Sequence, residues 1–269
     1  MRKALNVLIA VIIAATLCGC ADDVSSPMLT SRDIAKMLDH STLQPFLTEK
    51  DIRHGCEVAI KYGTATVCAR PQDMEIVVPM LKGTGVLPCT VIGFPHGAHT
   101  MEIKAMEAAR ALEDGCRELD MVINIGRMLG GDYDYVEREI KALAELCHDQ
   151  EAILKVIIET CYLSDEQKVK ACQLSESAGA DFVKTSTGYG TAGAKIADVA
   201  LMRRTVSDRV RVKASGGIRN LDTVLSCRAV GAARCGVSAT EAIMEEAIRR
   251  EQEGTLVVPE NLTEMNGGY

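Results

Sequence analysis

The chain has 269 residues, of which 47% are hydrophobic and 25% charged, with 22 glycines and 7 prolines. This balance is typical of a compact folded protein and excludes collagen or a long disordered chain. The net charge is −7, aromatic residues make up 3% and tryptophan is absent, which argues against a nucleic-acid-binding protein. The length suits either two small domains or one α/β barrel of about 250 residues.

The first 27 residues have two interpretations. Two basic residues precede the apolar run from Ala4 to Leu17, which ends in a sequence similar to a bacterial lipoprotein cleavage box, with Cys20 as the lipidated residue. The run is too short to span a bilayer comfortably. In the second interpretation translation begins at Met28, where MLTSRDIAKMLDH predicts a first helix, and the preceding residues are dispensable.

The cysteines favour a reducing compartment. There are eleven, and apart from Cys18 and Cys20 they occur singly, without the C-x-x-C spacing of a zinc or redox site. Cys68 and Cys235 lie within apolar runs, as small buried hydrophobic residues do. We therefore predict a cytoplasmic protein, with a membrane-anchored lipoprotein through Cys20 as the alternative.

Strands and helices alternate along the remaining chain. A first strand is expected near Ala35 to Asp39. Short apolar or β-branched runs predict seven more, at 64–69, 87–93, 117–123, 152–159, 181–185, 209–214 and 232–237. Segments of helical period lie between them, for example 101–115 and 164–180. Eight strand–helix units with apolar strands predict an α/β fold, a single (β/α)8 TIM barrel. We expect a barrel domain over 28–253, preceded by the leader or misassigned start at 1–27 and followed by a flexible tail at 254–269.

Ionisable residues stand near the ends of three predicted strands. Asp120, Lys184 and Lys213 occupy these positions, and Lys155 lies earlier in its strand. The carboxyl-terminal rim of such a barrel is where ligands bind, so these side chains are expected to converge there. A buried lysine near a second ammonium can lose its proton, and its neutral amine can attack a carbonyl to form an iminium.

Each of these residues also has a purely structural interpretation. Lys184 taken alone could point outward with its amine in water. Asp120 could form a salt bridge with Lys155 or Lys184 as part of the barrel architecture. Glycines in two loops favour a site: Gly216 and Gly217 follow the seventh strand, and Gly236 and Ser238 follow the eighth. These two loops form the usual phosphate site of TIM barrels, where backbone N–H groups and a helix N-terminus bind the anion.

Several motifs closely resemble the deoxyribose-phosphate aldolase family over about residues 28–250. They are MLDHSTLQP, VIGFPHGAHT, GCRELDMVINIG, LKVIIET, AGADFVKTSTGYGTAGA and VKASGGIRN. The resemblance implies a class I aldolase in a TIM barrel that reversibly cleaves 2-deoxy-D-ribose 5-phosphate to D-glyceraldehyde 3-phosphate and acetaldehyde. It implies neither a metal nor a cofactor.

The resemblance also implies roles for single residues. Lys184 matches the Schiff-base lysine, Lys213 matches the second lysine that depresses the pKa of the first, and Asp120 matches the acid/base aspartate. Gly216, Gly217, Gly236 and Ser238 would hold the phosphate. Some relatives end in a flexible tail whose terminal tyrosine reaches the site, and Tyr269 is the corresponding residue here.

The chain departs from the family pattern at a few positions. Ala69 and Arg70 replace the usual residues after the second strand, which puts any substrate contact there in doubt. Tyr189 stands where some relatives carry a lysine that faces the phosphate. The expected partners are small phosphosugars and aldehydes, with no nucleic acid and no metal, and a homodimer is left open. The alternative function, a surface-tethered barrel that binds phosphosugars without turnover, has no need of two close lysines.

Overall fold

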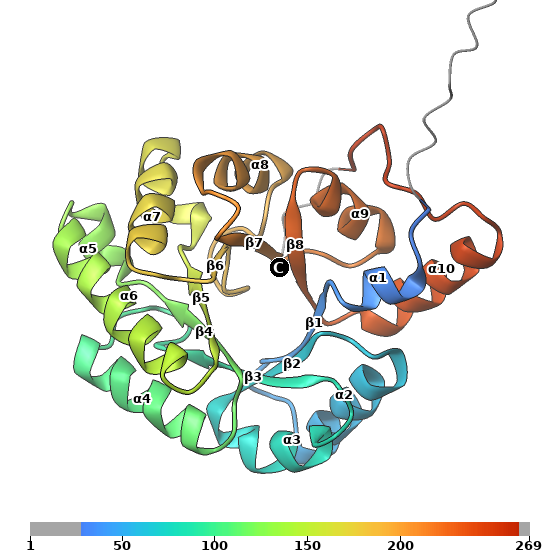
Figure 1. The fold of residues 1–269 in the computed structure, drawn as a ribbon, viewed down its shortest axis with the longest axis horizontal. Helices are drawn as coiled ribbons and strands as arrows, with labels where there is room; N and C mark the ends of the chain where they lie inside the picture. Colours follow the sequence, from blue (N-terminus) through green and yellow to red (C-terminus); the bar gives the residue numbers. More distant parts are fainter. Residues whose placement is uncertain (1–27, 264–269) are drawn as a thin grey trace, which may run out of the picture.

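The computed structural model describes residues 28–263, and within this range the chain forms a closed eight-stranded parallel barrel (Figure 1). Each strand pairs with the next along the chain, and β8 pairs with β1 to close the ring. The strands are β1 (Leu38–Thr42), β2 (Thr66–Ala69), β3 (Leu87–Ile92), β4 (Glu118–Val122), β5 (Ile153–Ile157), β6 (Phe182–Lys184), β7 (Arg211–Ser215) and β8 (Ala232–Val237). The predicted TIM barrel is confirmed.

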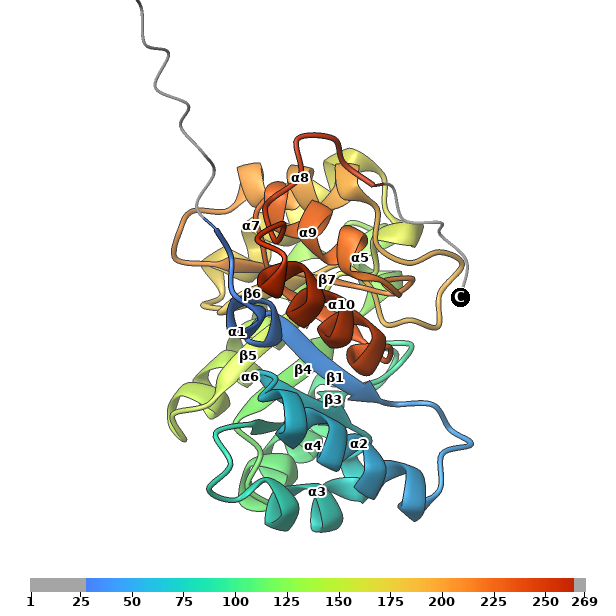
Figure 2. The same ribbon diagram turned by 90° about the vertical axis from the view of Figure 1, so that its right-hand side faces the viewer.

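Helices surround this barrel on its outside, as Figures 1 and 2 show. The α-helices are α1 (Ser31–Ala35), α2 (Glu49–Tyr62), α3 (Met74–Leu81), α4 (Met101–Glu113), α5 (Ile125–Leu129), α6 (Tyr133–His148), α7 (Asp165–Ser177), α8 (Ile196–Thr205), α9 (Leu221–Ala229) and α10 (Thr240–Gln252). Two 3-10 turns, η1 (Pro71–Asp73) and η2 (Thr160–Tyr162), follow β2 and β5. Buried apolar side chains between helices and strands form the main core.

The first strand differs from the prediction. The expected first helix is present but covers only Ser31–Ala35, and β1 begins at Leu38, so the strand expected near Ala35 to Asp39 starts three residues later. The segment LDHST looks polar, yet it is buried because β2 and β8 flank it and close the ring. Asp39 and His40 find partners far along the chain, in Lys213 and Thr240 respectively, which local sequence patterns do not reveal.

The end of the described chain packs against the barrel. Leu256 is fully buried and its carbonyl accepts a hydrogen bond from Leu29 N at 3.0 Å. Thr263 N donates to Ser226 Oγ at 2.8 Å. Among the described residues, none of the helices has the length and apolar character needed to cross a membrane. Cys20 and Tyr269 lie outside the described residues.

A buried ion pair lies between α4 and α6, outside the barrel wall. Lys104 Nζ is 2.7 Å from Glu139 Oε1 and donates to Val122 O at 2.7 Å, with both side chains fully buried. Glu139 Oε2 accepts from Asn124 N at 3.0 Å. The pair therefore ties two helices to the carboxyl end of β4, the strand that carries Asp120.

Replacing Glu139 by alanine should reduce the free energy of unfolding by about 3–5 kcal/mol, because the Lys104 ammonium would be left buried without its carboxylate. Chemical denaturation measures this loss. Asp114→Ala is a matched control, since its ion pair with Arg110 is largely exposed and should contribute less than about 1 kcal/mol. Equal losses in the two variants would contradict the account.

Candidate functional site

Four ionisable side chains on consecutive strands meet inside the barrel. Asp120 lies on β4, Lys155 on β5, Lys184 on β6 and Lys213 on β7, and all four are buried. Asp120 Oδ2 accepts from Lys184 Nζ at 2.6 Å and from Lys213 Nζ at 2.7 Å. Asp120 Oδ1 accepts from Lys155 Nζ at 2.8 Å. The structure thus brings together the residues that the sequence analysis selected, and Lys184 does not point into solvent.

Three further charged residues, which the sequence analysis did not select, belong to the same cluster. Asp39 on β1 lies 2.5 Å from Lys213 Nζ and 2.5 Å from the Arg234 guanidinium on β8. Glu118 on β4 lies 2.6 Å from Lys155 Nζ and 3.1 Å from Arg234. The available signal was a charged residue inside an apolar run for Glu118 in RELDMV and Arg234 in AARCGV, whereas Asp39 lies in the polar segment LDHST and gave no such signal.

The cluster contains four basic side chains and three carboxylates. The basic side chains differ in the number of carboxylates within ion-pair distance. Among the described residues, Lys184 has one carboxylate within ion-pair distance, that of Asp120. Lys213 has two, from Asp39 and Asp120, and Lys155 has three. Among the lysines of this cluster, Lys184 therefore has the fewest carboxylate partners, and it lines a cavity.

The surrounding charges fix the protonation of the other members. Burial alone would raise the pKa of Asp120, but the ammonium groups of Lys155, Lys184 and Lys213 outweigh it and hold this pKa well below its usual range. Burial alone would lower the pKa of Lys213, but Asp120 and Asp39 raise it above its usual range. Lys213 therefore remains a cation beside Lys184.

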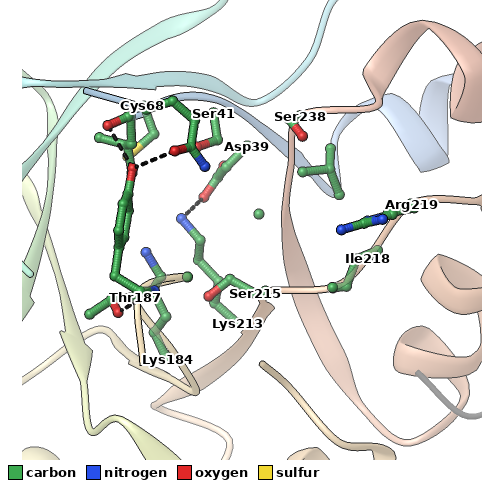
Figure 3. A pocket seen from close by; sticks show the side chains of 18 residues that line it. Asp39, Ser41, Cys68, Lys184, Thr187, Lys213, Ser215, Ile218, Arg219 and Ser238 are labelled. Atoms are coloured by element: carbon green, nitrogen blue, oxygen red, sulfur yellow. Dashed lines mark hydrogen bonds and ion pairs between the residues drawn. The ribbon is translucent and has the colours of Figure 1, made fainter. Parts of the chain in front are cut away.

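The cluster opens into a cavity of about 170 Å³ at the carboxyl ends of the strands. Figure 3 shows the side chains of Lys184 and Lys213 on one side of this cavity and Arg219 on another. The four predicted phosphate-site residues also line it: Gly216, Gly217, Gly236 and Ser238. Gly236 lies within β8 rather than after it.

The loops after β7 and β8 lead directly into helices. Gly216 and Gly217 have φ values of 88° and 80°, a left-handed backbone that favours glycine. α9 begins at Leu221 and α10 at Thr240, so the N-termini of both helices follow the loops that line the cavity. Helix N-termini and exposed backbone N–H groups attract anions. The cavity thus contains the amine of Lys184 and, in the loops after β7 and β8, backbone suited to bind an anion.

Glu159, another residue that the sequence analysis missed, holds the loop after Lys184. Its backbone has a left-handed φ of 52°, which is uncommon for a non-glycine residue, and its side chain is buried. The carboxylate accepts hydrogen bonds from the backbone N–H and the hydroxyl of Thr187. Thr187 Oγ1 in turn accepts from Tyr189 N at 3.0 Å.

Tyr189 joins this loop to the opposite side of the cavity. Its hydroxyl donates to Leu43 O at 2.9 Å, and its ring packs edge-on against Phe94 with centroids 5.5 Å apart. Leu43 and Tyr189 both line the cavity. Tyr189 thus forms part of the wall, at the position where some relatives were expected to present a lysine.

Comparisons with known proteins identify the family of this chain. Residues 34–245 match the model of a family described as DeoC/LacD family aldolase. The chain is 47% identical over 235 residues to the deoxyribose-phosphate aldolase of Rhodopirellula baltica, covering 87% of this chain and 97% of that protein. It is 49% identical over 225 residues to the enzyme of the same name from Thermococcus gammatolerans, covering 83% of this chain and 100% of that one.

A solved structure is also similar. It is described as a unique tetrameric structure of deoxyribose phosphate aldolase from Aeropyrum pernix, with 32% sequence identity and a TM-score of 0.76. The similarity covers 81% of this chain and 92% of the other.

Proposed function

This chain belongs to the DeoC/LacD aldolase family, and from that premise we propose that it is a deoxyribose-phosphate aldolase whose nucleophile is Lys184. It reversibly cleaves 2-deoxy-D-ribose 5-phosphate to D-glyceraldehyde 3-phosphate and acetaldehyde. The observation that supports the nucleophile most strongly is that Lys184 lines the cavity and, within residues 28–263, forms an ion pair with one carboxylate, that of Asp120.

The reaction begins with attack of neutral Lys184 Nζ on the C1 aldehyde of the open-chain sugar. The resulting carbinolamine loses water and becomes a protonated imine. Removal of the proton from the C3 hydroxyl then lets the C2–C3 bond break, and its electron pair passes through C2 to the imine nitrogen. D-Glyceraldehyde 3-phosphate leaves, and an enamine remains on Lys184.

Protonation of the enamine at C2 gives the imine of acetaldehyde, and water releases acetaldehyde and the free amine. Asp120 and Lys213 carry protons in this cycle. One oxygen, Asp120 Oδ2, touches both amines, at 2.6 Å from Lys184 and 2.7 Å from Lys213. Because the pKa of Asp120 is depressed, its carboxylate holds a proton only in passing, which suits a relay that also works through water.

The phosphate of the substrate lies in the rim formed by Gly216, Gly217, Gly236 and Ser238. Arg219 lines the same cavity and supplies a side-chain cation there. A guanidinium suits a phosphate because its N–H groups match the phosphate oxygens in pairs. Arg219 was not among the residues that the sequence analysis selected.

Arg219→Ala should lower kcat/KM for the phosphorylated sugar by about 10–100-fold, mainly through KM, since one charge-assisted contact is lost. Steady-state kinetics with 2-deoxy-D-ribose as a second substrate provides the control, because that sugar lacks the phosphate and its kcat/KM should hardly change. An equal loss with both sugars would show that Arg219 does not recognise the phosphate.

The activity itself is tested by mixing the purified chain with 2-deoxy-D-ribose 5-phosphate and measuring acetaldehyde and D-glyceraldehyde 3-phosphate. Both products should form in equal amounts, and the reverse reaction should consume them. Binding of the sugar without product formation would contradict the proposal and favour a phosphosugar-binding barrel.

Further proposals concern the organisation of the chain. We propose a barrel domain over 28–253 within a homodimer in the cytoplasm; the similar protein from Aeropyrum pernix is described as a tetramer. Light scattering measures the number of copies. The mass of the native N-terminus distinguishes a start at Met28 from a lipid on Cys20, and a lipidated Cys20 would overturn the cytoplasmic location.

A further inference from the structure

Two cysteines lie beside the catalytic aspartate and take no part in the proposed reaction. Cys68 on β2 and Cys89 on β3 are register partners on neighbouring strands, and Asp120 lies on β4, the next strand. All three are buried: the exposed fraction is 2% for Cys68 and 0% for Cys89 and Asp120. Cys89 Sγ lies 3.3 Å from Asp120 Oδ1. One ligand atom from each of the three residues lies within 4.8 Å of the other two.

Ligand atoms this close together can surround a small thiophilic cation. Tetrahedral zinc, with bonds of about 2.3 Å to sulfur and about 2.0 Å to oxygen, separates neighbouring ligand atoms by roughly 3.5–3.8 Å. Two thiolates and one carboxylate suit zinc and, because of the sulfur, its softer relative cadmium. We propose that Cys68, Cys89 and Asp120 form a binding site for zinc-group divalent cations, and that an ion bound there inhibits the enzyme.

The site can be reached through the substrate cavity. Cys68 lines that cavity together with Lys184 and Lys213, and Figure 3 shows it on the cavity wall. Three protein ligands leave the fourth tetrahedral position to a water molecule. The ion therefore enters from the cavity, and a substrate already bound there hinders its entry.

The charge balance of the cluster permits this binding. A divalent cation takes the place of the two thiol protons, which leave to solvent, so the net charge of the cluster does not change. The ammonium group of Lys155 lies 3.4 Å from Cys89 Sγ and 2.8 Å from Asp120 Oδ1, while those of Lys184 and Lys213 contact the other oxygen of Asp120. Lys155 also contacts Glu118 at 2.6 Å, so its charge remains paired when Asp120 turns to the ion.

Inhibition follows from the role proposed above for Asp120 and rests on that proposal. A carboxylate that ligates a divalent cation is a much poorer proton acceptor. It also attracts the ammonium groups of Lys184 and Lys213 less strongly. The ion is thus an inhibitor that competes for Asp120, and it is no cofactor of the aldolase reaction.

The test uses the full chain, reduced and freed of metal by a chelator, to which cadmium chloride is added. The ultraviolet absorption of cadmium–thiolate bonds measures binding, and sugar cleavage measures inhibition. We expect one cadmium ion per chain, loss of turnover in parallel with the absorption, and recovery of turnover when excess chelator is added. Absence of the absorption at millimolar cadmium would overturn the proposal.

Serine variants locate the ion. Cys68→Ser and Cys89→Ser should each weaken cadmium binding by about 100-fold or more, since each removes one of three ligands. Each variant is compared with its own metal-free turnover. Cys56→Ser is the matched control, because Cys56 is equally buried but lies on α2, outside the barrel. Binding that persists in both serine variants would refute the site. Thermal unfolding verifies that each variant folds. If Cys68→Ser does not fold, Cys68→Ala is used in its place.

The two proposals can fail separately, because the cadmium–thiolate absorption does not depend on turnover. Cadmium binding to a protein that cleaves no sugar would refute the proposed function and leave the site standing. Normal cleavage without cadmium binding would refute the site alone.

Discussion

Replacing Lys184 by methionine should reduce kcat for sugar cleavage by about 10,000-fold or more, because the covalent intermediate can no longer form. Lys213 also lines the cavity, but Asp39 and Asp120 hold it as an ammonium, so it does not take over as nucleophile. The measurement is the rate of acetaldehyde release at saturating substrate.

Two controls separate chemistry from folding. Lys184→Arg keeps the positive charge beside Asp120 and should be as inactive as the methionine variant, since a guanidinium forms no Schiff base under these conditions. Lys168→Met removes another buried lysine, paired with Asp198 on the outer helices, and should retain turnover. Substantial turnover in Lys184→Met would refute the assignment of the nucleophile.

Asp120→Asn should lower kcat by about 100–10,000-fold while the barrel still folds. The amide cannot accept a proton from the C3 hydroxyl or pass one between the two amines. The barrel survives because Asp39 and Glu118 still pair with Lys155, Lys213 and Arg234. Turnover and thermal unfolding are measured on the same preparation.

The same variant should also be less stable at neutral pH. The folded pKa of Asp120 lies well below its unfolded value of about 4, so its carboxylate stabilises the fold above pH 4. This contribution is lost as the pH falls through the folded pKa. Stability of wild type and Asp120→Asn should therefore converge in acid. A variant that fails to fold at all would favour the architectural interpretation of Asp120, and a folded variant with full turnover would refute its role in proton transfer.

The architecture could be predicted from the sequence because it rests on local patterns. Seven of the strands lie where β-branched or apolar runs predicted them, within a few residues at either end. The first strand, Leu38–Thr42, could not be located this way, since its burial results from closure of the ring between β2 and β8.

The candidate site divides in the same way. Lys184, Lys213 and Asp120 could be selected because each is an ionisable residue in an apolar run beside a recognisable motif. In the structure Lys184 ends β6, whereas Asp120 and Lys213 lie in the middle of β4 and β7 rather than near their ends. Asp39 and Arg234 could not be selected in this way. They pair with each other only because the barrel closes, and 195 residues separate them along the chain. Glu159 was missed for a similar reason, since its role depends on Thr187 in the loop of the next strand.

The proposed reaction depends on a carbon–nitrogen bond that forms between the substrate and Lys184. Sodium borohydride, added to the protein with a low concentration of acetaldehyde, reduces the acetaldehyde imine to a stable N-ethyl lysine that peptide mass spectrometry can locate. The peptide with Lys184 should gain the ethyl group much faster than peptides with exposed lysines, and inorganic phosphate or an unreactive phosphosugar should slow this gain. An ethyl group that accumulates on Lys213 first, or on all lysines at the same rate, would contradict the role of Lys184 as the nucleophile.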